Sequence, residues 1–477
     1  MKNESEQSTY VGQWWLPHRP EQVMHGSLEI GVSHPELAIY ESLPFGQEGI
    51  AKEPNHSIIH GRSMGVDVTL LDSRQVSERS TQQGENEETY NVFIANTVLI
   101  GDEPLNEDEC RFNRAHFRLF NLDQWSNRTM YKHSESAVEA LDLPDLTARI
   151  PGCEVSLKRS TTVNRGRLTD AGFTSHEVIE LKIEERVSLE ELEHKFIRPI
   201  EQMLTLATGK HCEAFSLRVG NYDETKEWRD TWPLRFHKVR RKESDQKQPG
   251  KPMIRERMRF GMNSQHFPPN VEFGILVPNW YELQAKLSSQ CDWVFSLHSE
   301  VGGYLQQQVF TIASAIEALH RGLNPQHEEK TDDDRARNQA ILSVVKRECR
   351  EHHQWLADAI QFAHRKKYVF RGRELLEYTD HLMVEIVGDE EKWLQEVRQI
   401  RDGIGHVLNS SDDYTVEQMV ALLRSTCLFA ELVLLRQLGF SKEECRQALR
   451  HNWESENARH RMEISFPEWF DAAADKK

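Results

Sequence analysis

Two neighbouring stretches decide the fold class of the C-terminal half: LQEVRQIRDGIGH at residues 394–406 and VALLRSTCLFAELVLLRQL at residues 420–438. The first has the three-to-four-residue period of an amphipathic helix, carried by Leu394, Val397, Ile400 and Ile404. The second is apolar on nearly every side, which predicts a helix buried at the centre of a bundle. Together they predict an all-α domain.

The same helical pattern extends outward over residues 300–460. A second apolar stripe comprises Val309, Ile312, Ile316 and Leu319, and a weaker candidate comprises Trp355, Ile360 and Phe362. We therefore expect five or six helices in a compact bundle. The charged segment 323–338 has the composition of an exposed loop between two of them.

The N-terminal half has a different pattern of apolar and polar residues. Residues 10 to about 180 alternate between apolar and polar positions in short runs, such as VDVTLL at 66–71 and YNVFIA at 90–95. This pattern predicts half-buried strands. Residues 188–207 instead predict one amphipathic helix, because Ser188 and Glu191 have the spacing of a capping box and apolar residues follow every four positions.

The predicted fold is therefore α+β and multidomain. A sandwich-like, β-rich domain is expected at 10–290, including the helix at 188–207, and a helical bundle at 300–460. The paired Trp14 and Trp15 are expected to pack in the β core, although an exposed stacking surface is an alternative.

Composition limits the class of protein. The chain has 477 residues, 38% of them hydrophobic and 28% charged, which is enough for several packed domains. No apolar run is long enough to span a membrane, and the N-terminus lacks a secretory signal. We therefore expect a cytoplasmic protein without a membrane partner. The seven cysteines contain no C-x-x-C pair, so isolated buried thiols are expected instead of a zinc site or disulfide framework.

Charge is unevenly distributed. The net charge of −17 argues against a protein that coats nucleic acid indiscriminately, but it does not exclude a local basic patch. Segment 235–259 is such a patch, and it is either a phosphate-contacting loop or a solvated loop that balances acidic neighbours. The candidate RNA contacts in it are Arg240, Arg241, Lys242, Arg255 and Arg257.

Several motifs of common enzymes are missing or misplaced. The segment Gly61–Gly65 (GRSMG) matches G-x-S-x-G, but a strand-like run follows it where a nucleophile elbow requires a helix. We therefore interpret it as a connection between strands. The sequence contains no Walker A motif, no G-x-G-x-x-G and no H-E-x-x-H, so neither a cofactor nor a catalytic metal is expected.

The candidate catalytic pair is Arg401 and His406. Their R-x4-H spacing also occurs at Arg111/His116 and Arg347/His352, so the interest lies in the helical setting and in the polar residue Asp402. Five residues of unbroken helix would leave the two side chains about 140° apart. We expect Gly403 and Gly405 to end or deform the helix so that both side chains face one cleft. Alternatively, Arg and His from two chains meet across a symmetric interface, or the pair simply caps a helix.

This pair fits RNA cleavage without a metal. A neutral His406 can accept the proton of a ribose 2′-hydroxyl. Arg401 offers a permanently charged fork to the phosphate oxygens as negative charge builds up. Attack by the 2′-oxygen then leaves a 2′,3′-cyclic phosphate and a 5′-hydroxyl. A second His, from a partner chain, is a candidate acid for the leaving oxygen.

The C-terminal half resembles the HEPN superfamily of helical ribonucleases, in particular the HEPN domain of the ApeA anti-phage proteins. The residues that carry this resemblance are FTIASAIEAL at 310–319 and VRQIRDGIGH at 397–406. The N-terminal half looks like the ApeA N-terminal domain, through GQWWLP at 12–17, GSL at 26–28 and IHG at 59–61. Asp402 is within the set of residues that follow the motif's Arg, although Asn is the commoner choice.

The resemblance implies a two-part defence protein. Its HEPN domain would cut host or phage RNA, with tRNA as a candidate target, and would act as a homodimer through this domain. Its N-terminal domain would sense a phage-derived trigger or restrain the nuclease. Arg401 and His406 carry over as catalytic, and Glu317 would orient Arg401 through a charge-assisted hydrogen bond. The alternative function is a non-catalytic HEPN-type module that binds RNA or protein.

Overall fold

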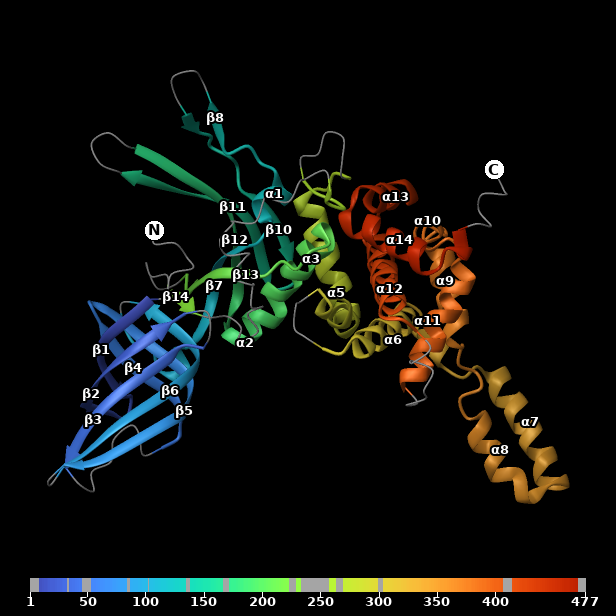
Figure 1. The fold of residues 1–477 in the computed structure, drawn as a ribbon, viewed down its shortest axis with the longest axis horizontal. Helices are drawn as coiled ribbons and strands as arrows, with labels where there is room; N and C mark the ends of the chain where they lie inside the picture. Colours follow the sequence, from blue (N-terminus) through green and yellow to red (C-terminus); the bar gives the residue numbers. More distant parts are fainter. Residues whose placement is uncertain are drawn as a thin grey trace. The chain divides into compact units, whose positions relative to one another are not determined.

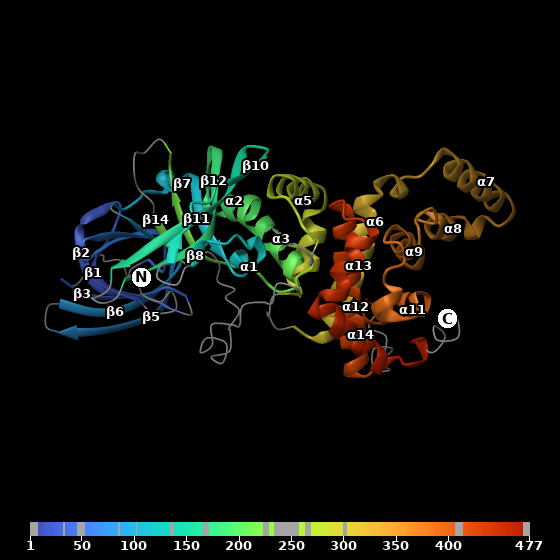
Figure 2. The ribbon, with the colours of Figure 1, turned by 90° about the horizontal axis from the view of Figure 1, so that it is seen from above.

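The computed structural model describes residues 8–31, 34–44, 53–83, 86–101, 103–133, 138–165, 171–222, 229–232, 257–262, 269–298, 303–405 and 414–470. They form two compact units (Figures 1 and 2). The strand-rich unit comprises Met1–Leu204, Cys212–Met253 and Val271–Pro278. The helical unit comprises Thr205–His211, Ile254–Asn270 and Asn279–Lys477. The predicted α+β class is confirmed, whereas functional domain limits at 290 and 300 stay a prediction.

The strand-rich unit contains one antiparallel sheet in the order β10-β11-β12-β7-β13-β14-β6-β3-β2-β1-β4-β5, and a separate hairpin of β8 and β9. The first six strands along the chain are β1 (Ser8–Leu16), β2 (Arg19–Ile30), β3 (Glu36–Pro44), β4 (Asn55–Ser63), β5 (Val66–Gln83) and β6 (Asn86–Gly101). The others are β7 (Arg111–Leu119), β8 (Tyr131–His133), β9 (Val138–Ala140), β10 (Leu146–Ile150), β11 (Cys153–Arg165), β12 (Ala171–Ser188), β13 (Ala214–Gly220) and β14 (Arg229–Trp232).

Six of these strands close into a barrel. β6 pairs with β3 and also with β5, which completes the ring β6-β3-β2-β1-β4-β5. The sheet is therefore closed here, where we expected a sandwich-like arrangement. The reason is the length of β5 and β6, which pair with each other over most of their course and leave this ring without an open edge.

The barrel interior contains the apolar faces of its strands. Trp14 is fully buried among Leu28, Leu37 and Phe93, as predicted, whereas Trp15 is only partly buried and is not part of this core. The Trp14 ring packs on Gly61 of β4, where any Cβ would lie 2.2 Å from the ring. The turn that follows contains Met64 and Gly65 with positive φ, and it connects β4 directly to β5. The GRSMG segment is thus a hairpin, as the following strand pattern predicted.

The predicted helix after β12 is present in three consecutive parts. These are α2 (Leu189–Leu192), a π-helical turn (Glu193–Ile197) and α3 (Arg198–Thr208). The Ser188 hydroxyl accepts from the Glu191 amide at 3.2 Å, and the Glu191 carboxylate accepts from the Ser188 amide at 3.1 Å. The capping box is therefore confirmed. A further short helix, α1, covers Leu122–Ser126.

The helical unit has more helices than the five or six we expected. Its described helices are α5 (Phe273–Ser296), α6 (Leu305–Leu323), α7 (Asp332–Glu348), α8 (His353–Ile360), α9 (Tyr368–Tyr378), α10 (Val384–Val387), α11 (Glu390–Gly405), α12 (Val416–Gln437), α13 (Lys442–His451) and α14 (Trp453–Ser465). Among the residues described, α12 alone has the length and apolar composition of a membrane span, and 83% of its most apolar window is buried. It is the predicted central helix.

One charged residue interrupts the apolar surface of α12. Glu431 is buried, and its carboxylate lies 2.7 Å from the guanidinium of Arg259 and 2.7 Å from Nε2 of His298. Arg259 also donates to the carbonyl oxygen of Leu206 at 3.1 Å. Burial by itself would raise the pKa of Glu431, but the charge of Arg259 and the hydrogen bonds from Arg259 and His298 lower it to about 2. Glu431 is therefore a buried anion that needs residues from distant parts of the chain.

The segment 323–338 is mostly not the loop that we expected. After a short 3-10 turn at Pro325–Glu328, α7 begins with Thr331 as its N-cap, whose hydroxyl accepts from the Asp334 amide at 3.1 Å. The charges that resembled a loop are the acidic first turn of a helix. The apolar pattern near Trp355 is not a buried stripe either, because α8 has no buried residue and Trp355 is 71% exposed.

Candidate active site

Arg401 lies near the end of α11, at the edge of the helix face that packs in the core. Val397 and Ile400 of the same helix are fully buried, as the apolar period predicted. Arg401 follows Ile400 directly, so its side chain lies at the boundary between core and solvent and is 25% exposed. The helix continues through Gly403 instead of breaking there. At Gly405 a Cβ would lie 3.1 Å from the ring of Phe310, so this glycine allows α11 to approach α6.

Glu317 of α6 holds the guanidinium of Arg401 from one side. The Nη2 of Arg401 donates to Oε2 of Glu317 at 2.5 Å, and Nη1 donates to Asp402 at 3.2 Å. Glu317 is only 13% exposed, so water screens this ion pair weakly. The expected contact between Glu317 and Arg401 is therefore present in the structure. Asp402 is 41% exposed and also accepts from Arg398 at 3.3 Å.

Tyr368 of α9 forms the floor beneath Arg401. The guanidinium carbon lies 5.1 Å from the centroid of the Tyr368 ring, within the range of a cation–π contact. Burial raises the pKa of the Tyr368 hydroxyl, although the charge of Arg401 opposes this effect, so the phenol stays neutral. With a carboxylate at one edge and an aromatic ring at one face, the guanidinium has a defined orientation.

The carboxylate of Glu317 belongs to a larger network of charges. It accepts from Arg321 at 2.7 Å and lies 3.8 Å from Nε of Arg371, a fully buried residue of α9. Arg371 in turn lies 2.5 Å from Oε1 of Glu328. Burial alone would raise the pKa of Glu328, but Arg371 holds it below its usual value. A continuous row of alternating charges thus runs from Arg401 to Glu328.

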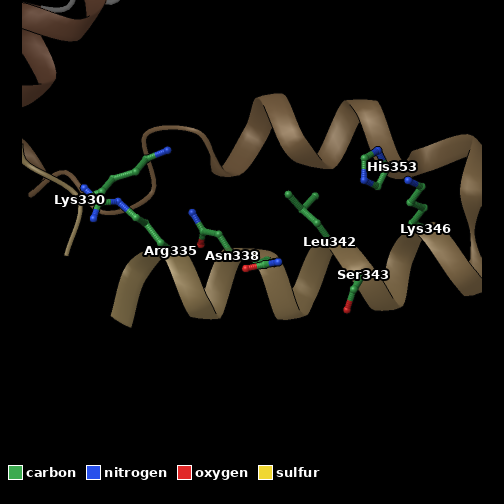
Figure 3. Close-up of a pocket in the computed structure, with 8 residues that line it drawn as sticks. Lys330, Arg335, Asn338, Leu342, Ser343, Lys346 and His353 are labelled. Atoms are coloured by element: carbon green, nitrogen blue, oxygen red, sulfur yellow. The ribbon is translucent and has the colours of Figure 1, made fainter. Parts of the chain in front are cut away.

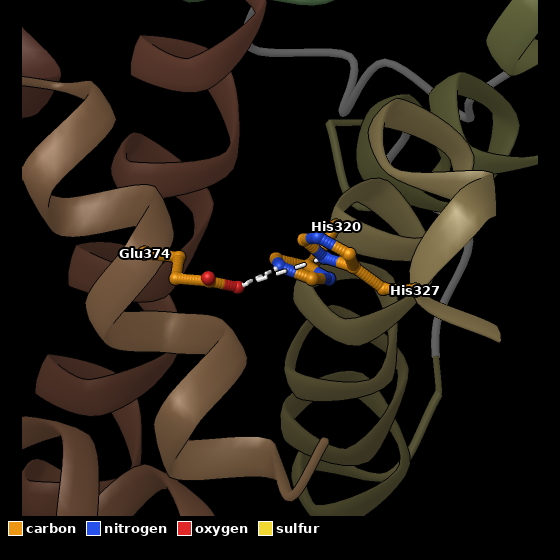
Figure 4. A group of neighbouring side chains, drawn as sticks. All are labelled: His320, His327 and Glu374. Atoms are coloured by element: carbon orange, nitrogen blue, oxygen red, sulfur yellow. Dashed lines mark hydrogen bonds and ion pairs between the residues drawn. The ribbon is translucent and has the colours of Figure 1, made fainter. Parts of the chain in front are cut away.

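A second polar group borders this network: His320, His327 and Glu374 (Figure 4). Their potential ligand atoms lie within 4.8 Å of one another, which is close enough for all three to reach one metal ion. Nε2 of His320 lies 2.7 Å from Glu374, and its Nδ1 lies 3.2 Å from Nη1 of Arg371. An arginine can only donate, so Nδ1 of His320 is the acceptor and Nε2 carries the proton towards Glu374.

These hydrogen bonds argue against a metal ion at this position. A metal at Nε2 would displace the proton that Glu374 accepts, and moving that proton to Nδ1 would oppose the donor of Arg371. Lys366 also lies 2.5 Å from the other oxygen of Glu374, so the carboxylate already has a cation. Burial lowers the pKa of His320, which keeps the ring neutral and able to accept from Arg371. The group is better explained as part of the hydrogen-bond network.

Other predicted site residues are placed less completely. His406 lies outside the described residues, so its approach to Arg401 stays a prediction. Arg240, Arg241, Lys242 and Arg255 also lie outside them. Arg257 is exposed, and its carbonyl oxygen accepts from Asn452 at 2.9 Å. The structure therefore brings together Arg401, Asp402 and Glu317, and it does not bring Arg257 to them.

The sequence analysis identified Glu317 but missed Tyr368 and Arg371, and it also missed His320 and Glu328, which Arg371 contacts. One signal was available for His320, which follows Glu317 by three residues on the apolar stripe of α6. Polar residues spaced in this way on a core-facing stripe need buried partners. No comparable signal identifies which helix provides those partners, because α9 follows α6 only after the hairpin of α7 and α8.

Comparisons with known proteins agree with this architecture. Residues 9–259 match the family described as ApeA N-terminal domain 1, and residues 310–444 match the Apea-like HEPN family. No curated protein and no solved structure matches the chain. HEPN domains are generally associated with ribonucleases, and the second match includes Glu317, Tyr368 and Arg401. The chain therefore belongs to the ApeA family, with an ApeA N-terminal domain followed by an ApeA-like HEPN domain.

Proposed function

We propose that this protein is a metal-independent endoribonuclease of antiviral, abortive-infection defence, with Arg401 and His406 as catalytic residues. The observation that carries the proposal is the fixed position of the Arg401 guanidinium, held by Glu317 and Tyr368 and still partly exposed. An oriented cation at the edge of a bundle can bind a phosphate without reorganising during the reaction. Glu317 is the positioning residue, and Asp402 assists it.

In the proposed reaction, His406 takes the proton of a ribose 2′-hydroxyl, and the 2′-oxygen attacks the adjacent phosphorus. Arg401 donates hydrogen bonds to the non-bridging oxygens, on which negative charge accumulates. The bond from phosphorus to the 5′-oxygen breaks, and that oxygen receives a proton from a second acid. The products are a 2′,3′-cyclic phosphate and a 5′-hydroxyl. No step requires a metal or an organic cofactor.

We infer that the second acid is His406 of another copy of the chain. HEPN domains commonly dimerise, and a symmetric pair would place two Arg401–His406 sets at one composite site. The ApeA N-terminal domain would then sense a phage-derived trigger, and it would keep the basal activity of this site low, but measurable, until the trigger binds. The proposed location is the cytoplasm, where host or phage RNA, including tRNA, is the substrate.

The test is incubation of the purified full chain with total tRNA in the presence of EDTA. The wild-type protein should produce fragments with cyclic phosphate ends, and Arg401→Ala and His406→Ala should remove this activity. Arg459→Ala is a matched control, because this arginine forms an exposed ion pair with Glu463 on the distant helix α14. It should cleave like the wild type.

The Arg401–Glu317 contact also fits a structural ion pair in a non-catalytic module, so the assay must separate the two functions. Intact RNA that migrates as a complex with the protein would support the binding module. Cleavage by Arg401→Ala or His406→Ala at the wild-type rate would contradict the catalytic assignment. Cleavage that stops in EDTA would contradict metal independence alone.

A further inference from the structure

The hairpin formed by α7 and α8 contributes nothing to the core of the helical unit. Neither helix has a buried residue, whereas α6 and α11 each bury a full apolar face. The two helices lie side by side, away from α12 (Figures 1 and 2). Helices in globular proteins owe most of their stability to a packed face, so a pair without one calls for another explanation.

A cationic groove lies between the two helices. It has a volume of about 430 Å³, and Figure 3 shows the residues that line it. Lys330 and Arg335 lie at one end, and Lys346 and His353 lie at the other. Between them lie the amides of Asn338 and Gln339 and the apolar Leu342. Ser343 borders the groove, but its hydroxyl points away from α8 and donates to the carbonyl oxygen of Ala340 at 2.7 Å. No carboxylate is among the residues that line the groove, although the whole chain carries a net charge of −17. Arg335 does form an ion pair with Asp332 at 2.6 Å, but both side chains are more than 60% exposed, so this pair is weak and a phosphate can replace it.

The spacing of these cations suits an extended polyanion. Arg335 and Lys346 are eleven residues apart on one helix, which separates their backbone positions by about 16 Å. A single phosphate cannot contact both ends, whereas successive phosphates of a nucleic acid strand can. The amide groups of Asn338 and Gln339, between the cations, provide neutral donors for the same backbone.

The tip of the hairpin adds an exposed aromatic ring. A second groove there is lined by Val345, Cys349, His352, Trp355 and Leu356. Trp355 is 71% exposed, more than any other tryptophan described. Single-stranded nucleic acids bind to surfaces that combine a positive groove with aromatic rings on which bases stack.

The base of the hairpin is tied to the network around Arg401. Glu328 lies shortly before α7, and Arg365 lies shortly after α8. The Nε atom of Arg365 is 3.8 Å from the carboxylate of Glu328. Glu328 also forms the ion pair with Arg371 at 2.5 Å, and Arg371 lies 3.8 Å from Glu317, the residue that holds Arg401. The hairpin therefore begins at the far end of the charge row that positions Arg401.

We propose that the α7–α8 hairpin is the site that grips the single-stranded part of the RNA substrate, with Lys330, Arg335 and Lys346 on the phosphates and Trp355 stacked on a base. That the ligand of the hairpin is RNA follows from the proposed ribonuclease function, on which this inference therefore rests. It goes beyond that function by separating substrate capture on the hairpin from chemistry at Arg401.

The test measures binding apart from cleavage. Fluorescence anisotropy with a labelled oligouridylate is recorded on the full chain carrying Arg401→Ala, with and without the triple change Lys330→Glu, Arg335→Glu and Lys346→Glu. Loss of three phosphate contacts should weaken binding about 100-fold near 0.1 M salt and reduce the salt slope by about 2. Trp355→Ala should weaken binding about tenfold, because one stacked base is lost.

The matched control reverses three exposed cations on α13 and α14, Lys442→Glu, Arg459→Glu and Arg461→Glu, and so changes the net charge equally. It should weaken binding far less than the groove variant. If the two triple variants lose RNA affinity equally, the proposal is overturned. It is also overturned if Trp355→Ala changes the oligomeric state of the protein but leaves RNA binding unchanged. Groove-dependent binding without cleavage by the wild type would support the grip and contradict only the proposed reaction.

Discussion

Replacing Glu317 by Gln tests whether the carboxylate positions Arg401 for catalysis. The amide keeps an acceptor oxygen but removes the charge from a pair whose atoms are 2.5 Å apart and mostly shielded from water. A hydrogen bond to a charged group contributes about 1.5–3 kcal/mol, and a neutral one about 0.5–1.5 kcal/mol. The expected loss is therefore about 1–2 kcal/mol.

If that energy orients the guanidinium in the transition state, the rate of cleavage should fall about 5- to 30-fold. The substrate concentration at half-maximal rate should not change, because substrate capture is assigned to the hairpin. The same loss should lower the Tm of the helical unit by about 2–8 °C. Single-turnover cleavage of labelled tRNA in EDTA gives the rate, and circular dichroism gives the Tm.

Glu282→Gln is the matched control for this experiment. Glu282 pairs with Lys286 at 2.7 Å, but both side chains are more than 60% exposed, so the change should affect neither rate nor Tm. A Glu317→Gln protein with a lowered Tm and a wild-type rate would refute the positioning role and leave the pair purely structural.

Two further changes test the folding of each unit. Gly61→Ala should destabilise the strand-rich unit by about 1–3 kcal/mol, because the new Cβ would lie 2.2 Å from the Trp14 ring. Gly172→Ala is the control, because its Cβ would enter open space. Denaturant unfolding of the two variants measures the difference in stability. Glu431→Leu should destabilise the helical unit by about 3–5 kcal/mol by leaving Arg259 buried without its anion. Because the pKa of Glu431 is lower in the folded protein than in the unfolded chain, its contribution to stability is complete above about pH 5 and is lost as the pH falls towards 2. Wild-type protein that already begins to unfold at neutral pH during an acid titration would contradict this assignment.

Much of the fold could be predicted from the pattern of apolar and capping residues within a few turns of chain. The stripe of Val309, Ile312, Ile316 and Leu319 is buried as expected, and the capping box of Ser188 and Glu191 is present, because each depends only on residues within a few turns. Barrel closure was not predictable in this way. It depends on the pairing of β5 with β6 and of β6 with β3, and alternation along a strand does not specify which neighbour it pairs with.

The candidate site was likewise predicted only in part. The spacing of an Arg–His pair is common in this sequence, so Arg401 was singled out by its helical setting and by the polar residue Asp402 that follows it. The family resemblance then supported its catalytic role and added Glu317. Tyr368 and Arg371 were missed because their roles arise from the packing of α9 against α6 and α11. Segment 323–338 was misread because a run of aspartates is equally typical of a loop and of the first turn of a helix.

The buried carboxylate of α12 determines how the chain can be divided. A fragment that starts near residue 300 would contain the whole motif region around Arg401 but would lack Arg259 and His298, the two partners of Glu431. An uncompensated anion in the middle of the central helix costs several kcal/mol, a large part of the stability of an ordinary domain. The helical HEPN half is therefore not expected to fold autonomously when it is cut from the chain at residue 300. One residue that its central helix requires, Arg259, precedes Arg401 by 142 residues (401 − 259) and is the last residue of the N-terminal family match.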